Sequence, residues 1–281
     1  MSLDDEVVSE LDLGEPPQEL LEWAKENLNE NPDTRYQVIS DLRDMIYARG
    51  ECTPHRTDDA FLLRFLRARF FVIERAHRLF VNYHDFKENN PQFVENVDLS
   101  TLKKLGEDHV ITVPPYREGS GRRIMQYRMG LWDLEKYTID EMFQATIATL
   151  EMAVLEQRAQ ILGGICIFDF SGLSMQQAWQ MTPSVAHKIF QIMVTSFPIK
   201  IHAIHIVNQS YIFEVIFNIF KPFLNEAMKE RIFFHGEDME IMVEYIQITV
   251  ATAGLLVVET TIKSLKNYDH WGIEIRKGKK K

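Results

Sequence analysis

The sequence has 281 residues, of which 46% are hydrophobic and 26% charged, values typical of a globular protein with room for two domains. Its net charge of −10 lies almost entirely in residues 1–30, where ten Asp and Glu side chains against one Lys give −9. No run of 18 apolar residues occurs and residues 1–10 are acidic, so we expect neither a transmembrane helix nor a signal peptide. Cys52 and Cys166 lack metal-type spacing, and we therefore expect a cytoplasmic protein with free thiols.

Four helices are predicted in the first third of the chain. Apolar residues recur at helical spacing over about 20 to 28 and again over about 34 to 49. Thr57-Asp58 offers an N-cap for a third helix, DAFLLRFLRARF, in which four residues are apolar while Arg64, Arg67 and Arg69 are not. A fourth helix, about 74 to 89, directs four apolar side chains inward: Ala76, Leu79, Phe80 and Tyr83.

The periodicity changes near residue 98, which predicts a domain boundary. We expect an acidic segment over 1–15, a helical domain over 16–92 and an α/β domain over 93–265, followed by a basic tail over 266–281. Strands that alternate with helices predict a mainly parallel sheet with crossover helices. The predicted elements of this domain are strands at 109–116 and 122–130, a helix from the Thr138–Glu141 capping box to about 160, a strand at 163–170, a helix at 182–196, a strand at 200–208, an apolar helix at 211–224 and a strand at 231–236.

The apolar helix at 211–224 has too many apolar residues for a single buried face. Its polar side chains, Glu214, Asn218 and Lys221, form one narrow stripe, and it is too short to span a bilayer. Three interpretations fit this pattern: a helix inside a core, a lid over a hydrophobic cavity, or a helix on a membrane surface. Basic residues on both sides of the helix favour the last two, because each gains about 1 kcal/mol near anionic lipid.

No catalytic template fits the sequence. The Gly119–Gly121 turn lacks the third glycine of a dinucleotide fingerprint, and the nine histidines include no HExxH pair. His202 and His205 are predicted on opposite faces of a strand, which argues against a shared metal ion. For Asp169, at the end of an apolar strand, capping of the next turn is favoured over a functional role.

Four segments resemble successive blocks of the CRAL-TRIO lipid-transfer family, in order and over about residues 15 to 250. They read DDAFLLRFLRARFF, GGICIFDFSGL, TPSVAHKIFQIMVTSFPIKIHAIHIVNQ and IFKPFLNEAMKERIFFHG. Within the family the chain resembles most the branch that contains alpha-tocopherol transfer protein and the retinaldehyde-binding proteins. The resemblance implies an α/β lipid cage with a mobile lid helix, preceded by the helical N-terminal domain.

The resemblance also implies a function, that of a non-enzymatic carrier that needs no cofactor. Such a carrier binds one hydrophobic lipid of the tocopherol, retinoid, carotenoid, sterol or terpenoid class under the lid and transfers it between membranes, without contacting nucleic acid. The ligand-binding positions implied by the family are Phe143, Thr146, Leu150, Phe168, Met175, Met181, Ile189, Ile192, Met193, Ile201 and Ile204.

Membrane contact is expected at the lid, and aspartate at Phe213 and Phe217 is expected to abolish transfer with the fold intact. The family's phosphoinositide positions correspond here to Lys200, His202, Ala227 and Arg231, of which two are firmly cationic. The segment after the last strand also departs from the family pattern. The residues assigned to the lid are Phe213, Phe217, Phe220 and Leu224, and those assigned to anionic lipid are Lys200, Lys221, Lys229 and Arg231.

Two alternatives come from other functional classes. One is an adaptor that binds a protein partner through the acidic N-terminal segment, with lipid as a structural filler. The other is an enzyme that acts on a lipid, which is disfavoured because no activated nucleophile or metal-ligand set is visible in the sequence.

Overall fold

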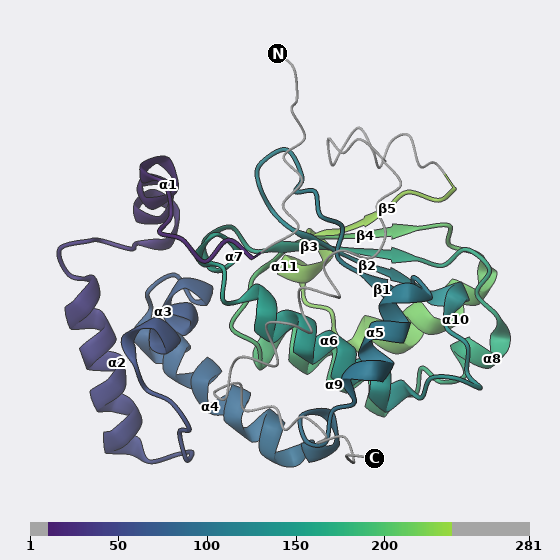
Figure 1. The fold of residues 1–281 in the computed structure, drawn as a ribbon, viewed down its shortest axis with the longest axis horizontal. Coiled ribbons are helices and arrows are strands. Elements are labelled where there is room, and N and C mark those ends of the chain that lie inside the picture. The colour runs from purple at the N-terminus through teal and green to yellow at the C-terminus, as the bar shows by residue number, and fades with distance from the viewer. Residues whose placement is uncertain (1–10, 238–281) are drawn as a thin grey trace, which may run out of the picture.

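The computed structural model describes residues 11–237. Its first part is a helical unit, seen in purple and blue in Figure 1. The expected acidic segment up to residue 10, the domain end beyond residue 237 and the basic tail lie outside the described residues. The helices of this unit are α1 (Gln18–Leu28), α2 (Arg35–Arg49), α3 (Asp59–Ala68) and α4 (Ile73–Asn89), followed by the short η1 (Pro91–Phe93).

Aromatic packing holds α3 against α4. The Asp58 side chain accepts a hydrogen bond from the Phe61 N–H at 3.1 Å, so it caps α3 as predicted. The Phe65 ring lies edge to face with Phe80 at 5.1 Å and with Tyr83 at 5.5 Å. The predicted inward face of α4 is confirmed, because all four of its apolar residues are buried. On α3, Arg64 and Arg67 are buried together with the apolar side chains.

The second part contains a five-stranded sheet in the order β1-β2-β3-β4-β5. Strand β1 (Ile111–Thr112) runs antiparallel to β2 (Ile124–Arg128), and all later neighbours are parallel. The remaining strands are β3 (Gly164–Asp169), β4 (Ile201–Val207) and β5 (Ile232–Phe234). The predicted fold class, a mainly parallel α/β domain preceded by helices, is confirmed.

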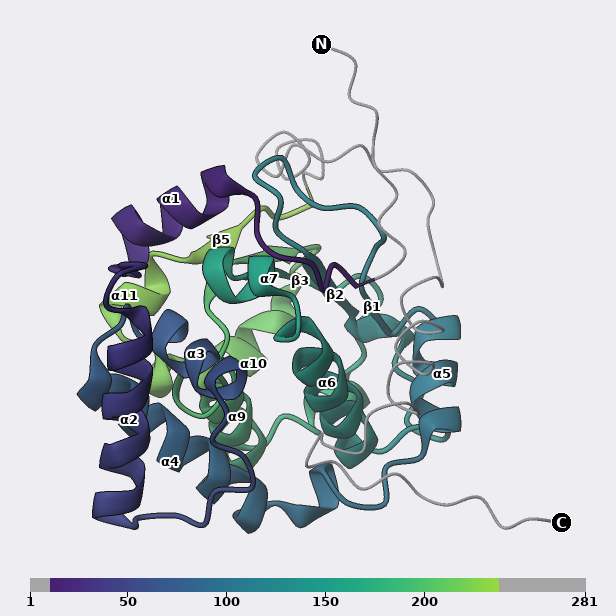
Figure 2. The same ribbon diagram turned by 60° about the vertical axis from the view of Figure 1, so that its left-hand side comes forward.

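Helices cover one face of the sheet, below it in Figures 1 and 2. They include α6 (Ile139–Ala153), which starts with the predicted capping box, and α9 (Pro183–Phe190), which continues into the π-helical turn η3 (Gln191–Thr195). The apolar helix forms α10 (Tyr211–Phe220) and then the short η4 (Lys221–Phe223). Four further helical elements were not predicted as separate elements from the sequence. They are α5 (Leu99–Glu107), η2 (Met129–Leu131), α8 (Met175–Ala178) and α11 (Glu226–Lys229).

The single helix expected from residue 138 to about 160 is wrong. The chain leaves the helical path after α6 and starts again as α7 (Gln157–Leu162). The break places the Glu156 carboxylate, which is fully buried, against Arg117 and Arg123 of the connection between β1 and β2. A continuous helix would leave these long-range ion pairs unmade.

The two parts of the chain share a hydrophobic core. Phe93 stacks on Phe143 of α6 at 4.6 Å, and Tyr83 of α4 contacts the ring of Phe197 at 5.7 Å. A second cluster lies between the sheet and its covering helices, and α1 packs on α7 through Leu28 and Ile161. Among residues 11–237 no helix is both long and apolar enough to cross a membrane.

Candidate functional site

A cavity of about 160 Å³ lies between the covered face of the sheet and helices α6 and α9. Nine of the eleven residues that the sequence assigned to ligand binding line it, and they come together from six separate elements or connections. Their contact with a ligand stays a prediction. The nine are Phe143, Thr146, Leu150, Phe168, Met181, Ile189, Ile192, Met193 and Ile201.

The other two assigned residues lie close to the cavity but do not line it. Ile204 of β4 is buried in the cluster between the sheet and its covering helices, and Ile201 packs against the same cluster. Met175, at the start of α8, packs half-buried against the same cluster.

Strand β2 supplies lining residues that the family resemblance did not indicate. Met125 and Tyr127 line the cavity. Ile124, the residue before Met125, touches the cavity too but is buried in the cluster on the opposite face of the sheet. The two-residue period of the strand, read in MQY, could have identified them. Six of the chain's twelve methionines line the cavity, which gives it a flexible and polarisable wall: Met125, Met129, Met142, Met152, Met181 and Met193.

Away from the end lined by Arg123 and Lys200, the polar groups on the cavity wall are few, and they are uncharged at neutral pH. The Tyr127 hydroxyl lies 3.1 Å from Thr146 Oγ1, and the Tyr127 ring stacks on Phe168 at 4.8 Å. Desolvation raises the pKa of the Tyr127 hydroxyl, and it raises the pKa of the Cys166 thiol to about 12. The hydroxyl pair can therefore bind a polar group of a ligand without placing a charge in the cavity.

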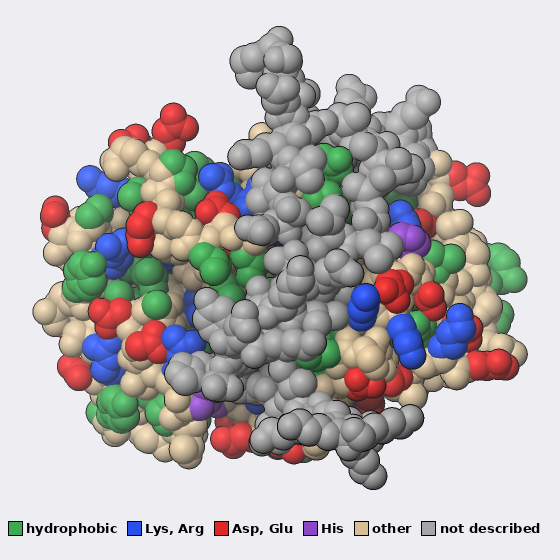
Figure 3. All heavy atoms as spheres, viewed as in Figure 1, with side chains coloured by type: hydrophobic (Ala, Val, Ile, Leu, Met, Phe, Trp, Pro, Cys, Tyr) green, Lys and Arg blue, Asp and Glu red, His purple; other side chains and the backbone are tan. Residues whose placement is uncertain are grey.

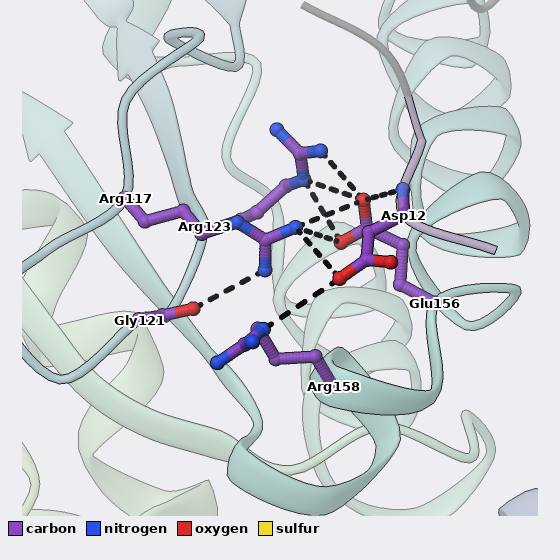
Figure 4. Close-up of polar contacts among 6 residues, drawn as sticks. All are labelled: Asp12, Arg117, Gly121, Arg123, Glu156 and Arg158. Atoms are coloured by element: carbon purple, nitrogen blue, oxygen red, sulfur yellow. Dashed lines mark hydrogen bonds and ion pairs between the residues drawn. The ribbon is translucent and has the colours of Figure 1, made fainter. Parts of the chain in front are cut away.

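An ion-pair cluster, drawn in Figure 4, lies at the end of the cavity that Arg123 lines. Arg117 and Arg123 donate to the carboxylate of Glu156, which also accepts a hydrogen bond from the Asp12 backbone N–H at 2.9 Å. The Asp12 carboxylate lies 3.8 Å from Arg158. These contacts fix the start of the described chain beside the cavity, where Leu11 forms part of the wall.

Lys200 lies at the same end of the cavity. Its ammonium group donates to the Ile161 carbonyl at 2.6 Å and lies over the rings of Trp23 and Phe70 at 5.6 and 5.5 Å. Desolvation lowers the pKa of Lys200 to about 7, with nearby Arg122 as the next cause. The close approach requires Gly163, because a Cβ there would lie 2.4 Å from the Lys200 carbonyl oxygen.

The residues assigned to anionic lipid differ in their surroundings. Lys200 shares its surroundings with Arg231 and with Arg122, which the sequence did not single out. Lys229 instead pairs with Glu226 at 2.8 Å, and exposed Lys221 lies near the Phe217 ring. On the described surface visible in Figure 3, Lys and Arg side chains lie beside Asp and Glu side chains.

Helix α10 packs on α8 and α9. Its residues Ile212, Phe213 and Ile216 are buried in the cluster that also contains Met181, but no residue of α10 lines the cavity. Phe213 is 6% exposed, which corrects the expectation that aspartate there would leave the fold intact. The remaining residues assigned to the lid are half-buried: Phe217, Phe220 and Leu224.

One prediction about a polar residue of the sheet is confirmed. Asp169 accepts from the Ser171 N–H at 2.9 Å and from Asn208 at 2.8 Å, so its carboxylate caps the turn after β3. His202 is exposed and His205 is buried beside His235. The register between β3 and β4 skips His202, so the placement of the two histidines on opposite faces stays a prediction. Within residues 11–237 no group of three or more His, Cys, Asp or Glu side chains could hold a metal ion.

Two family models match the chain. Residues 107–253 match the CRAL/TRIO domain, and residues 17–82 match the CRAL/TRIO N-terminal domain. The chain is 37% identical to the Mus musculus protein named alpha-tocopherol transfer protein-like, over 79% of this chain and 65% of the relative. It is 36% identical to Clavesin-1 of Xenopus laevis, over 79% of this chain and 67% of the relative. The chain thus spans about two thirds of the length of these relatives.

A solved structure, that of Sfh5, aligns with 85% of this chain and 99% of its own length, with a TM-score of 0.49 and 11% identity.

Proposed function

This chain belongs to the CRAL-TRIO family, and from that membership we propose that it binds one hydrophobic lipid in the cavity beneath the sheet and transfers it between membranes. The proposal includes no chemical step and no cofactor. The names of its relatives support a small hydrophobic ligand, because one of them refers to tocopherol transfer.

The observation that carries the proposal is the apolar wall of the cavity. Each buried CH₂ group of a ligand contributes about 0.8 kcal/mol relative to water, but a membrane already supplies most of that energy. Affinity must therefore come from the shape of the cavity and from its few polar groups. The methionines allow the wall to adapt its shape, and the hydroxyl pair of Tyr127 and Thr146 is placed to select a polar group of the ligand.

The size of the cavity supports a change of conformation on binding. Its volume of about 160 Å³ is below the roughly 300–1,000 Å³ of typical small-molecule sites. A lipid of tocopherol or retinoid size therefore requires the wall to move outward. Helix α10 covers α8 and α9, which carry or adjoin the lining residues Met181, Ile189 and Met193, so we assign it the role of the mobile lid.

Docking to a membrane is assigned to exposed apolar side chains on α10 and next to α8. Trp179 is 68% exposed, Tyr211 76% and Val215 46%. The two helices are in contact, and aromatic side chains of this kind are enriched at membrane interfaces. This surface replaces Phe213, which faces the core, in the proposed docking step and implies a transient peripheral association with membranes.

A cavity-filling substitution tests the proposed function. Leu150→Trp places an indole into the cavity from α6, whereas the control Leu131→Trp makes the same change at an exposed position. We expect Leu150→Trp to lose transfer of a fluorescent tocopherol analogue or of retinol between vesicles at least tenfold, and Leu131→Trp to transfer as wild type does. Equal transfer by both variants, with both folded, would show that this cavity is not the lipid site.

A further inference from the structure

A second cavity, of about 460 Å³, lies between the helical unit and the segments that follow α6. Of the described residues, none lines both cavities. Its rim includes the exposed residues Leu13, Tyr36 and Asp59, so it opens toward solvent between α2 and α3. Its floor is polar and buried, and it consists of Arg64, Tyr83, Glu151 and Gln160.

Arg64 is the unusual group of this floor. Its side chain is 5% exposed, and its guanidinium donates no hydrogen bond to any residue in the range 11–237. Arg67, one turn further along α3, is fully buried too but donates four hydrogen bonds, two to Glu30 and one each to Gln157 and Gln160. The Nε–H of Arg64 is buried and has no partner, which is costly, and the other guanidinium N–H groups make no hydrogen bond within residues 11–237, so the donors of Arg64 are available to a ligand in the cavity.

The acidic groups near Arg64 already have other partners. Glu151 lies 2.6 Å from the Lys87 ammonium and accepts the Tyr83 hydroxyl at 2.6 Å. Its charge still attracts Arg64, but without a hydrogen bond between them. On the rim, Asp59 pairs with Arg43.

A second cation lies close to Arg64. The guanidinium carbons of Arg56 and Arg64 lie 5.1 and 4.8 Å from the centre of the same ring, Phe61. Arg56 is held by both oxygens of Asp58, at 2.8 and 3.0 Å. The cavity therefore contains the guanidinium group of Arg64, which makes no hydrogen bond within residues 11–237, next to the guanidinium group of Arg56. This arrangement favours the binding of an oxyanion.

We propose that this cavity binds the phosphate or carboxylate group of a small molecule through the guanidinium of Arg64. Planar, paired N–H donors match the oxygens of either group in a bidentate manner. The volume exceeds what the anion alone requires, and the apolar side chains of Ile39, Leu63 and Leu155 line the remaining space. The site therefore accepts a molecule in which the anion carries an apolar portion.

Calorimetric titration of the full chain tests the site. The probes are inorganic phosphate and hexyl phosphate at constant ionic strength, added to wild type, Arg64→Met and Arg64→Lys. The matched control is Arg78→Met, which removes the same charge from an exposed position on α4. Arg64→Lys keeps the charge but loses the fork, and it decides the outcome if Arg64→Met does not fold.

We expect saturable binding to wild type and to Arg78→Met, at least tenfold weaker binding to Arg64→Lys, and none to Arg64→Met. Equal affinity for the two probes assigns the site to a free anion, whereas at least tenfold tighter binding of hexyl phosphate assigns it to an amphiphile; both results support an oxyanion site. The inference is overturned if wild type binds neither probe, or if both Arg64 variants bind as wild type does.

Discussion

The aromatic contacts of Phe213 allow the lid assignment of α10 to be tested quantitatively. The Phe213 ring lies 4.8 Å from Phe170, which follows β3, and 6.0 Å from Phe234 of β5. Both partners lie outside α10, whereas Phe217 is on α10 and moves with it. Phe213→Leu keeps an apolar side chain in place but removes two aromatic pairs, each contributing about 0.5–1.5 kcal/mol. Opening of α10 should therefore become easier by about 1–3 kcal/mol, which raises the open fraction about 5- to 150-fold.

Stopped-flow release of a fluorescent lipid into acceptor vesicles measures this effect. If lid opening limits release, Phe213→Leu should release the lipid faster by that factor, while Asn218→Ala, at an exposed position of the same helix outside the docking surface, should not change the rate. The lid assignment is refuted if Phe213→Leu lowers the thermal stability of the protein yet releases lipid within twofold of the wild-type rate.

Two further predictions follow from Lys200 and from the exposed apolar side chains. The pKa of Lys200 is about 7 in the folded protein, against an ordinary lysine value of 10.5. Between pH 7 and pH 10.5 the unfolded chain therefore binds one proton more than the folded chain. The free energy of unfolding should rise with pH in this range, by up to about 1.4 kcal/mol per pH unit. In Lys200→Met, the free energy of unfolding measured with urea should not rise with pH in this way. The same rise in the variant as in wild type would show that Lys200 is not its cause. The double variant Trp179→Asp with Val215→Asp should keep the wild-type unfolding midpoint, because both side chains are exposed, but should sediment with anionic vesicles at least tenfold less; undiminished sedimentation would place docking elsewhere.

Local patterns were sufficient to predict most elements of the fold. The cap at Asp58 and the box at Thr138 depend on residues three positions apart, and both form as expected. The alternation of strands and helices likewise predicted the mainly parallel sheet. In each case the signal lies within a few residues of the element that it specifies.

Features that depend on distant residues could not be predicted in the same way. The break before α7 exists because Glu156 meets Arg123, 33 residues away, and the burial of Arg67 depends on Glu30, 37 residues away. Phe213 was expected at the surface because a helix that is apolar on most faces does not show which face is covered. The missed lining residue Tyr127 had a signal in the alternation of β2, but only the packing of α6 shows which face of the strand holds the cavity.

The central claim, that the chain carries one hydrophobic molecule beneath its sheet, is tested most directly by counting that molecule. Mass spectrometry of the organic extract of protein purified from its native tissue gives the amount of bound lipid per chain. We predict one enriched hydrophobic species at close to one molecule per chain, and its loss from Leu150→Trp but not from Leu131→Trp expressed in the same tissue. Folded wild-type protein with no enriched lipid, or equal lipid in both variants, would contradict the claim.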